Sequence, residues 1–145
     1  MMKTKRIILA IVLSLSMAGV VGSLKAQENL NALMKKCETA QNVNVEALFE
    51  KNPKTKKPTR NMTTVTFFVK DNSKLQDEFL EAFQKDRNAA YKVIEDKKNG
   101  KIIPSFYRFA AGTTDITYTF EIEKNGSISV TRIERFDFDY DKQFG

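Results

Sequence analysis

The sequence predicts an α+β fold, in which an antiparallel sheet of about four to five strands carries two or three helices, in the order α-β-β-α-β-β-β. Two stretches, 28–41 and 73–98, space their apolar residues as one face of a helix does. The other stretches alternate apolar and polar residues, as half-buried strands do. Helices and strands do not follow one another singly, which argues against a doubly wound parallel fold.

Residues 1–26 have the pattern of a cleavable signal peptide. A short cationic head precedes an uncharged run, 7–21, which is shorter than the roughly 20 apolar residues of a membrane-spanning helix. We expect cleavage after Ala26. The alternatives are cleavage after Gly22 or Ser23, or an N-terminal anchor that is not cleaved. Residues 27–145 then form a single domain, periplasmic or secreted from a Gram-negative bacterium, with no transmembrane segment after cleavage.

The positive charge of the chain is concentrated at its start. The sequence has 24 Lys and Arg against 18 Asp and Glu, a net charge of +6. Four of the cations and none of the acids precede Gln27, which leaves 20 cations against 18 acids in the expected mature domain, or +2. A strongly basic chain suggests nucleic-acid binding, but this small excess and the expected export argue against it.

The stretch 28–41 predicts an amphipathic helix. Leu30, Leu33, Met34 and Cys37 fall on one stripe, at the spacing i, i+3, i+4, i+7. Cys37 is the only cysteine, which excludes an intramolecular disulfide. Its place on the stripe indicates a buried, unreactive thiol.

Residues 43–70 predict a β-hairpin with a basic connecting loop. The segment between its limbs, KNPKTKKPTRN, has two prolines and five cations but no acid. The cations are Lys51, Lys54, Lys56, Lys57 and Arg60. Such a loop is either a solvated tip that keeps the sheet edge soluble or a contact for an anionic partner.

A second helix is predicted from Ser73. Ser73 and Gln76 have the spacing of a capping box, and apolar residues continue at helical spacing to Ile94. The Asn-Gly pair at 99–100 would end this helix. The polar stretch 85–88 is where it can break in two.

The last third predicts strands. Residues 102–109 form the first, and Pro104 within it indicates an edge strand or a bulge. The next strand alternates cleanly from 115 to 122 and turns at 124–126 into a further strand. Its alternation slips between 130 and 133, which predicts a bulge there.

The turn at 124–126 can be formed in two ways. A two-residue Asn-Gly loop would pair Ile122 with Ser129. A three-residue loop with Gly126 left-handed pairs Ile122 with Ile128. We prefer the second, because it puts apolar residues opposite each other.

Few catalytic arrangements are open to these residues. The chain has no histidine and one cysteine, which excludes Ser-His-Asp and Cys-His arrangements and the usual zinc ligand sets. Asp137, Asp139 and Asp141 have the first spacings of a calcium loop, but Lys142 stands where that loop needs glycine. We therefore expect no metal, no cofactor and no catalytic residue.

Aromatic pairs are the second group of binding candidates. Phe67 with Phe68, and Phe106 with Tyr107, put rings on both faces of their strands. Either helices cover both faces, or one face is an exposed platform to which Phe68, Phe106 and Tyr107 contribute.

Five strings resemble small secreted domains of unknown function from Gram-negative gut bacteria. They are KNPKTKK, DNSKLQDEFLEAF, GKIIPSFYRF, KNG and IERFDFD. The resemblance covers nearly all of 28–141. It implies an exported single domain with no assigned activity, and it supplies no site residues.

These observations favour a non-catalytic interaction or binding module of the periplasm or cell exterior. The expected partner is an envelope protein, an anionic glycan or a lipid headgroup, bound by the basic loop or the aromatic face. The alternative is a small-ligand carrier, or an enzyme that uses carboxylates and tyrosines such as Tyr107 and Tyr118. A deep pocket would favour the alternative, and a flat sheet with exposed rings the binding module.

Overall fold

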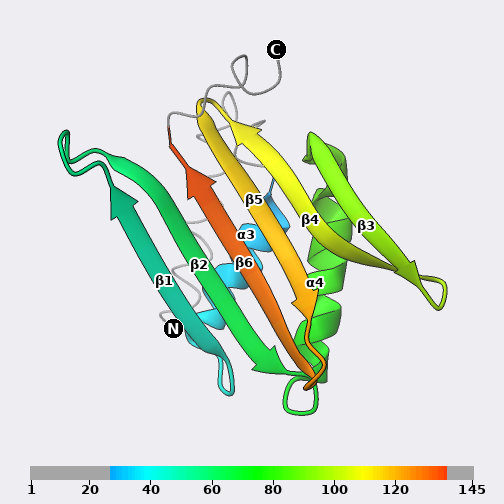
Figure 1. The fold of residues 1–145 in the computed structure, drawn as a ribbon. Coiled ribbons are helices and arrows are strands. Elements are labelled where there is room, and N and C mark those ends of the chain that lie inside the picture. The colour runs from blue at the N-terminus through cyan, green and yellow to red at the C-terminus, as the bar shows by residue number, and fades with distance from the viewer. Residues whose placement is uncertain (1–26, 137–145) are drawn as a thin grey trace, which may run out of the picture.

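A computed structural model describes residues 27–136 of the chain (Figure 1). Its helices are α3 (Glu28–Cys37), α4 (Ser73–Asp86) and a short 3₁₀ helix, η2 (Arg87–Ala89). Its strands are β1 (Asn44–Lys51), β2 (Pro58–Phe68), β3 (Lys92–Lys98), β4 (Lys101–Ala111), β5 (Thr114–Ile122) and β6 (Ser127–Arg135). The predicted signal peptide lies outside the described residues.

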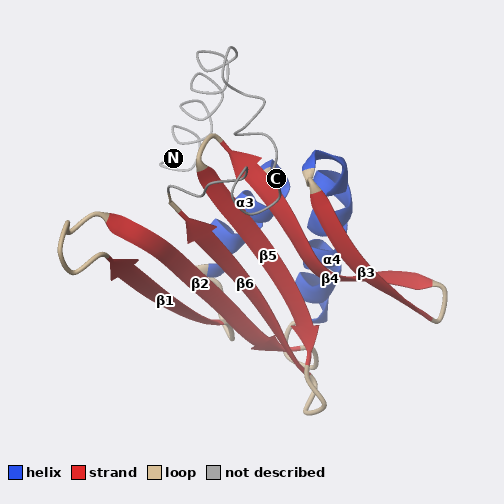
Figure 2. Ribbon diagram, turned by 45° about the horizontal axis from the view of Figure 1, so that its top comes forward, coloured by secondary structure: helices blue, strands red, loops and turns tan. Residues whose placement is uncertain are grey.

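The six strands form one antiparallel sheet in the order β1-β2-β6-β5-β4-β3. The last described strand, β6, therefore lies between β2 and β5 and joins the first hairpin to the rest of the sheet. Both long helices lie on the same side of the sheet (Figures 1 and 2). The α+β antiparallel prediction is confirmed, but the sheet has more strands than the four to five expected.

The core lies between the helices and the sheet. The predicted stripe of the first helix is buried throughout: Leu30, Leu33, Met34 and Cys37. From α4, the ring of Phe83 meets three strand rings edge-on, those of Tyr107 at 5.1 Å, Phe120 at 5.8 Å and Tyr118 at 6.4 Å between centroids. Edge-to-face pairs at these distances stabilise a core beyond the area that they bury.

The second helix is shorter than predicted. It ends at Asp86, and the apolar residues after it belong to β3, which pairs with β4. Asn99 and Gly100 have positive φ angles of 52° and 78°, so they form the tight β3–β4 turn rather than a helix cap. The capping box does not form either, because Asn72 precedes the first helical residue, Ser73, and caps the helix without a side-chain hydrogen bond.

The register of the last hairpin is as predicted. Ile122 lies opposite Ile128, and Gly126 has a φ of 88°. The bulge expected at Pro104 is present, because Glu95 of β3 pairs with Pro104 directly after Ile94 pairs with Phe106.

The bulge predicted in β6 is absent. Its pairing with both neighbours runs without a shift from Ser127 to Arg135. Because the strand alternates regularly, Arg132 lies on the helix-covered face and Ile133 on the opposite face. The slip in the apolar pattern therefore marks a polar residue on the helix-covered face, not an extra residue in the strand.

Candidate functional site

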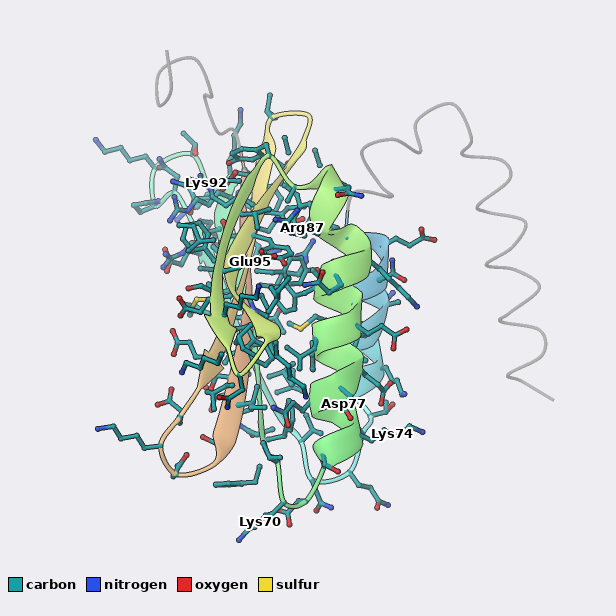
Figure 3. The ribbon with its side chains drawn as sticks, turned by 90° about the vertical axis from the view of Figure 1, so that its right-hand side faces the viewer. Lys70, Lys74, Asp77, Arg87, Lys92 and Glu95 are labelled. Carbon is teal, nitrogen blue, oxygen red and sulfur yellow. The ribbon has the colours of Figure 1, made fainter. Side chains whose placement is uncertain are left out.

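The sheet face opposite the helices is not covered by any described residue, and we call it the open face. Figure 3 shows the sheet edge-on, with the helices on one side and this face on the other. Its centre carries hydroxyl side chains in cross-strand rows. Thr64 and Thr131 approach to 3.3 Å between Oγ1 atoms, and Thr66 lies 3.5 Å from the Oγ of Ser129. Thr119 extends the first row onto β5.

One end of the open face is cationic, and we call it the basic end. Its residues come from the β1–β2 loop and five strands: Lys51, Lys54, Lys56, Lys57, Arg60, Lys92, Arg108 and Arg135. Register places Arg60 of β2 directly opposite Arg135 of β6. On the same face but toward the β3 edge of the sheet, Lys92 of β3 lies opposite Arg108 of β4.

Two carboxylates partly balance this charge. Glu50 forms an ion pair with the Arg60 guanidinium. Asp115, which is fully buried, accepts a hydrogen bond from the Tyr91 hydroxyl and lies 3.0 Å from Nη2 of Arg108. Arg135 is exposed and lies directly opposite Asp115 of β5, although the two form no ion pair. Two carboxylates therefore face eight cations across the basic end.

The loop that carries the lysines has a defined turn. The Asn52 side chain accepts hydrogen bonds from the backbone N–H groups of Lys54, at 2.8 Å, and Thr55, at 3.1 Å. Lys56 has a positive φ of 64°, and its N–H donates to the Asn52 carbonyl at 2.8 Å. Lys54, Lys56 and Lys57 are therefore held on one ordered turn at the edge of the sheet, directly after Lys51 at the end of β1.

The structure separates the predicted aromatic candidates. Phe106 lies on the open face, with the Lys92 ammonium 5.7 Å from its ring centroid. Phe68 is exposed on the same face but at the far end of β2, beside Lys70. Tyr107 is completely buried on the helix-covered face and so belongs to the core. Helices thus cover one face only, and the half-buried ring of Phe106 and the exposed ring of Phe68 do not form one platform.

Three cations of the basic end were not identified from sequence: Lys92, Arg108 and Arg135. Each is isolated from the other cations in sequence, and only the strand order brings the three to the same end of the sheet. No local alternation marks Lys92 and Arg108, because Ile94 and Phe106 share their face of the sheet.

One protein-family model, "Domain of unknown function (DUF5024)", matches residues 27–133. The chain belongs to this family. None of the curated proteins matches the chain. The predicted resemblance to a family of domains of unknown function is thereby confirmed, whereas export and a source in gut bacteria stay predictions.

Several ionisable groups of this DUF5024 chain have shifted pKa values. Burial raises the pKa of the Cys37 thiol to about 11, with Glu78 adding to the effect. Burial also raises the pKa of Tyr107 and of Tyr118. The hydrogen bond from Arg87 lowers the pKa of Glu95. Figure 3 shows this pair between the end of α4 and β3. All these shifts point away from neutral pH, so none prepares its group for proton transfer there.

Residues 27–136 of the DUF5024 chain have neither a cluster of metal ligands nor a helix suited to cross a membrane. In this part no three His, Cys, Asp or Glu side chains are grouped as metal ligands. None of its helices has the length and apolar character to cross a membrane. The acidic residues Asp137, Asp139 and Asp141 lie outside the described part.

Proposed function

We infer that this DUF5024 domain is a non-catalytic binding module, exported to the periplasm or cell exterior, whose basic end binds an acidic polysaccharide. The observation that carries this proposal is the convergence of eight cations from six segments at one end of an uncovered sheet face.

The opposed arginines support an anionic ligand. Like charges directly opposite each other in a sheet are destabilising. Glu50 offsets Arg60. Asp115 lies directly opposite Arg135 on β5, but its carboxylate is already engaged by Arg108. The two opposed arginines therefore keep an excess of positive charge. An anion placed between the two guanidinium groups would relieve this repulsion, and arginine binds carboxylate and sulfate-like groups through paired N–H donors.

The centre of the open face favours a polysaccharide over a protein. Threonine and serine are under-represented at protein-interface hot spots, and serine and lysine are depleted in such interfaces. On the open face, threonine and serine form the centre, and lysine is frequent at the basic end. Rows of hydroxyl groups suit a polyhydroxylated ligand, because each can both donate and accept a hydrogen bond.

Three features support a role without catalysis. The chain has no histidine. The shifted pKa values described above move away from neutrality. The most perturbed groups, Cys37, Tyr107 and Tyr118, are buried under the helices on the face away from the basic end.

The test compares two triple variants of the full chain. Lys54→Gln, Lys57→Gln and Arg135→Gln remove three charges from the basic end. Lys70→Gln, Lys74→Gln and Lys124→Gln remove the same charge from the opposite end, where Figure 3 places Lys70 and Lys74. Heparin serves as a sulfated probe, polygalacturonate as a carboxylated one and dextran as an uncharged control.

We expect the basic-end variant to bind heparin and polygalacturonate about 10- to 100-fold more weakly, at roughly 0.5–1 kcal/mol for each contact removed. The opposite-end variant should stay within about twofold of the wild type, and the difference should shrink with added salt. Equal losses in both variants would contradict the proposal. Binding to vesicles of anionic phospholipid but to neither polysaccharide would replace the glycan by a lipid surface.

A further inference from the structure

A pocket of about 310 Å³ lies on the helix-covered side of the sheet, between α3 and strands β2 and β6. Its lining residues are Asn31, Met34, Lys35, Glu38, Thr63 and Arg132. It exists because the sheet extends past the helix layer: Phe49 of β1, on the same side, remains 59% exposed. Pockets of about this size hold small organic ligands.

Arg132 occupies an unusual place for a charged residue. Two and four positions earlier in β6, Val130 and Ile128 are completely buried on the same face. The Arg132 side chain is only about one-fifth exposed. Placing a guanidinium beside a core is costly unless its hydrogen bonds are satisfied.

Neighbouring side chains hold this guanidinium in one orientation. Its Nε donates to Oδ1 of Asn31 at 2.9 Å and to the Tyr118 hydroxyl at 3.0 Å. Its Nη2 lies 3.3 Å from Glu134, and the group stacks 5.9 Å above the Tyr118 ring. The Tyr118 hydroxyl also donates to Asn31.

Not all the donors of Arg132 are used. A guanidinium has five N–H donors, and these contacts engage Nε and Nη2. Nη1 has no hydrogen-bond partner among residues 27–136. A pre-oriented guanidinium at the wall of a pocket, with donors left over, is the arrangement that receives a carboxylate.

We propose that this pocket binds a small carboxylate with a compact apolar body. The carboxylate is received by Arg132, with the Lys35 ammonium as the second cation of the lining. The apolar body packs against Met34 and the methyl group of Thr63. The site is independent of the basic end, because Arg132 lies on the opposite face of the sheet from Arg60 and Arg135.

The test is a titration of the isotope-labelled full chain, followed by nuclear magnetic resonance. The ligands are isovalerate and phenylacetate, with isovaleramide and phenylacetamide as uncharged analogues and inorganic phosphate as an anion without an apolar body. We expect saturable shifts of the Arg132 Nε–H and of Thr63 with the carboxylates. The amides and phosphate should bind at least tenfold more weakly.

Two variants and a control locate the carboxylate. Arg132→Lys keeps the charge but loses the planar fork, and should weaken carboxylate binding at least tenfold. Lys35→Gln, at an exposed helix position, should weaken it about threefold without affecting the fold. Arg87→Lys, which lies outside the pocket lining at the end of α4, should leave the affinity unchanged.

Any of three results would overturn the proposal: equal binding of amide and carboxylate, shifts that map away from Thr63 and Arg132, or no saturation up to about 10 mM ligand. If Arg132→Lys lowers the melting temperature, the wild-type shifts and Lys35→Gln still decide between a ligand site and a purely structural arginine.

Discussion

Burial shifts the pKa of three weak acids in the core of this DUF5024 domain in one direction. Cys37 on α3, Tyr107 on β4 and Tyr118 on β5 are each almost inaccessible, and removal from water disfavours their charged forms. Each is therefore harder to ionise in the folded chain than in the unfolded one. These residues bind protons in the native state at a pH where the unfolded state has released them.

We predict that the domain loses stability as the pH rises from about 9 towards 11. Above the ordinary pKa of cysteine the unfolded state binds fewer protons than the folded state, so the free energy of unfolding falls with pH. The stabilisation is complete below pH 9 and is lost as the pH rises through the raised pKa of Cys37, about 11. Thermal melts between pH 7 and 11 measure this loss.

The same burial predicts that the Cys37 thiol is alkylated slowly in the folded protein. At pH 8 a thiol of pKa about 11 is about 100-fold less ionised than one of pKa 9, so iodoacetamide should label the native protein at least 100-fold more slowly than the urea-unfolded protein. In the melts, Cys37→Ala should show a smaller alkaline loss than the wild type. A melting temperature that is constant to pH 11 would contradict the assignment.

Single residues were predicted well where the apolar stripe decides their place, and poorly where a distant partner does. Cys37 follows from helical spacing alone. Arg132 does not, because its partner Asn31 lies 101 residues earlier, and only the folded sheet brings the two together. From sequence alone, the shift in the apolar alternation around Arg132 predicts a β-bulge instead.

At the scale of elements, one buried carboxylate joins the two helices. Asp86, the last residue of α4, is 3% exposed. Its Oδ2 accepts from the Leu30 N–H at 2.8 Å, and its Oδ1 accepts from the Asn29 N–H at 3.3 Å and side-chain Nδ2 at 2.8 Å. The first turn of α3 thus has its unpaired N–H groups satisfied by the other helix rather than by its own cap residue.

We predict that Asp86→Ala lowers the free energy of unfolding by about 2–4 kcal/mol. The substitution leaves buried N–H donors without an acceptor, and hydrogen bonds to a charged group are among the stronger ones. Urea denaturation measures the loss. Asp86→Asn retains one acceptor oxygen and should lose less.

Asp77→Ala, an exposed position on the same helix, is the matched control and should change stability by less than about 0.5 kcal/mol. If Asp86→Ala were as stable as this control, the carboxylate would not anchor α3.

The β3 strand shows why element type was harder to predict than element position. Ala90, Tyr91 and Ile94 continue the spacing of the α4 stripe, so periodicity alone favours a longer helix. The chain instead turns through η2 and pairs with β4, where the Tyr91 N–H donates to the Arg108 carbonyl at 2.9 Å. Short apolar runs fit both the helical repeat of 3.6 residues and the strand repeat of two. Long-range strand pairing then decides between helix and strand.

At the scale of the whole molecule, strand order creates the candidate site. The lysines of the first hairpin were recognisable as a cluster because they are close in sequence. Arg60 and Arg135 lie 75 positions apart and become neighbours only because β6 inserts beside β2. No local pattern fixes that insertion, so the basic end could be predicted only at its β1–β2 loop.

The acidic residues that follow β6 bear directly on this site. The Phe136 N–H donates to the Thr59 carbonyl at 3.1 Å, which keeps the chain beside β2 up to that residue. Asp137, Asp139 and Asp141 come next in sequence. At no more than about 3.5 Å per residue, the first of them stays within a Debye length of Arg135. Carboxylates this close in sequence to Arg135 are expected to compete with an anionic ligand of the proposed site.

We therefore predict that Asp137→Asn, Asp139→Asn and Asp141→Asn together strengthen heparin binding several-fold. The control variant, Asp71→Asn, Asp77→Asn and Glu123→Gln, removes the same charge at the opposite end of the molecule and should strengthen binding less than twofold. Affinity is measured at two salt concentrations, because a local electrostatic effect weakens as the Debye length shortens. Equal gains in the two variants would show that net charge alone, and not a site at the basic end, attracts the polysaccharide.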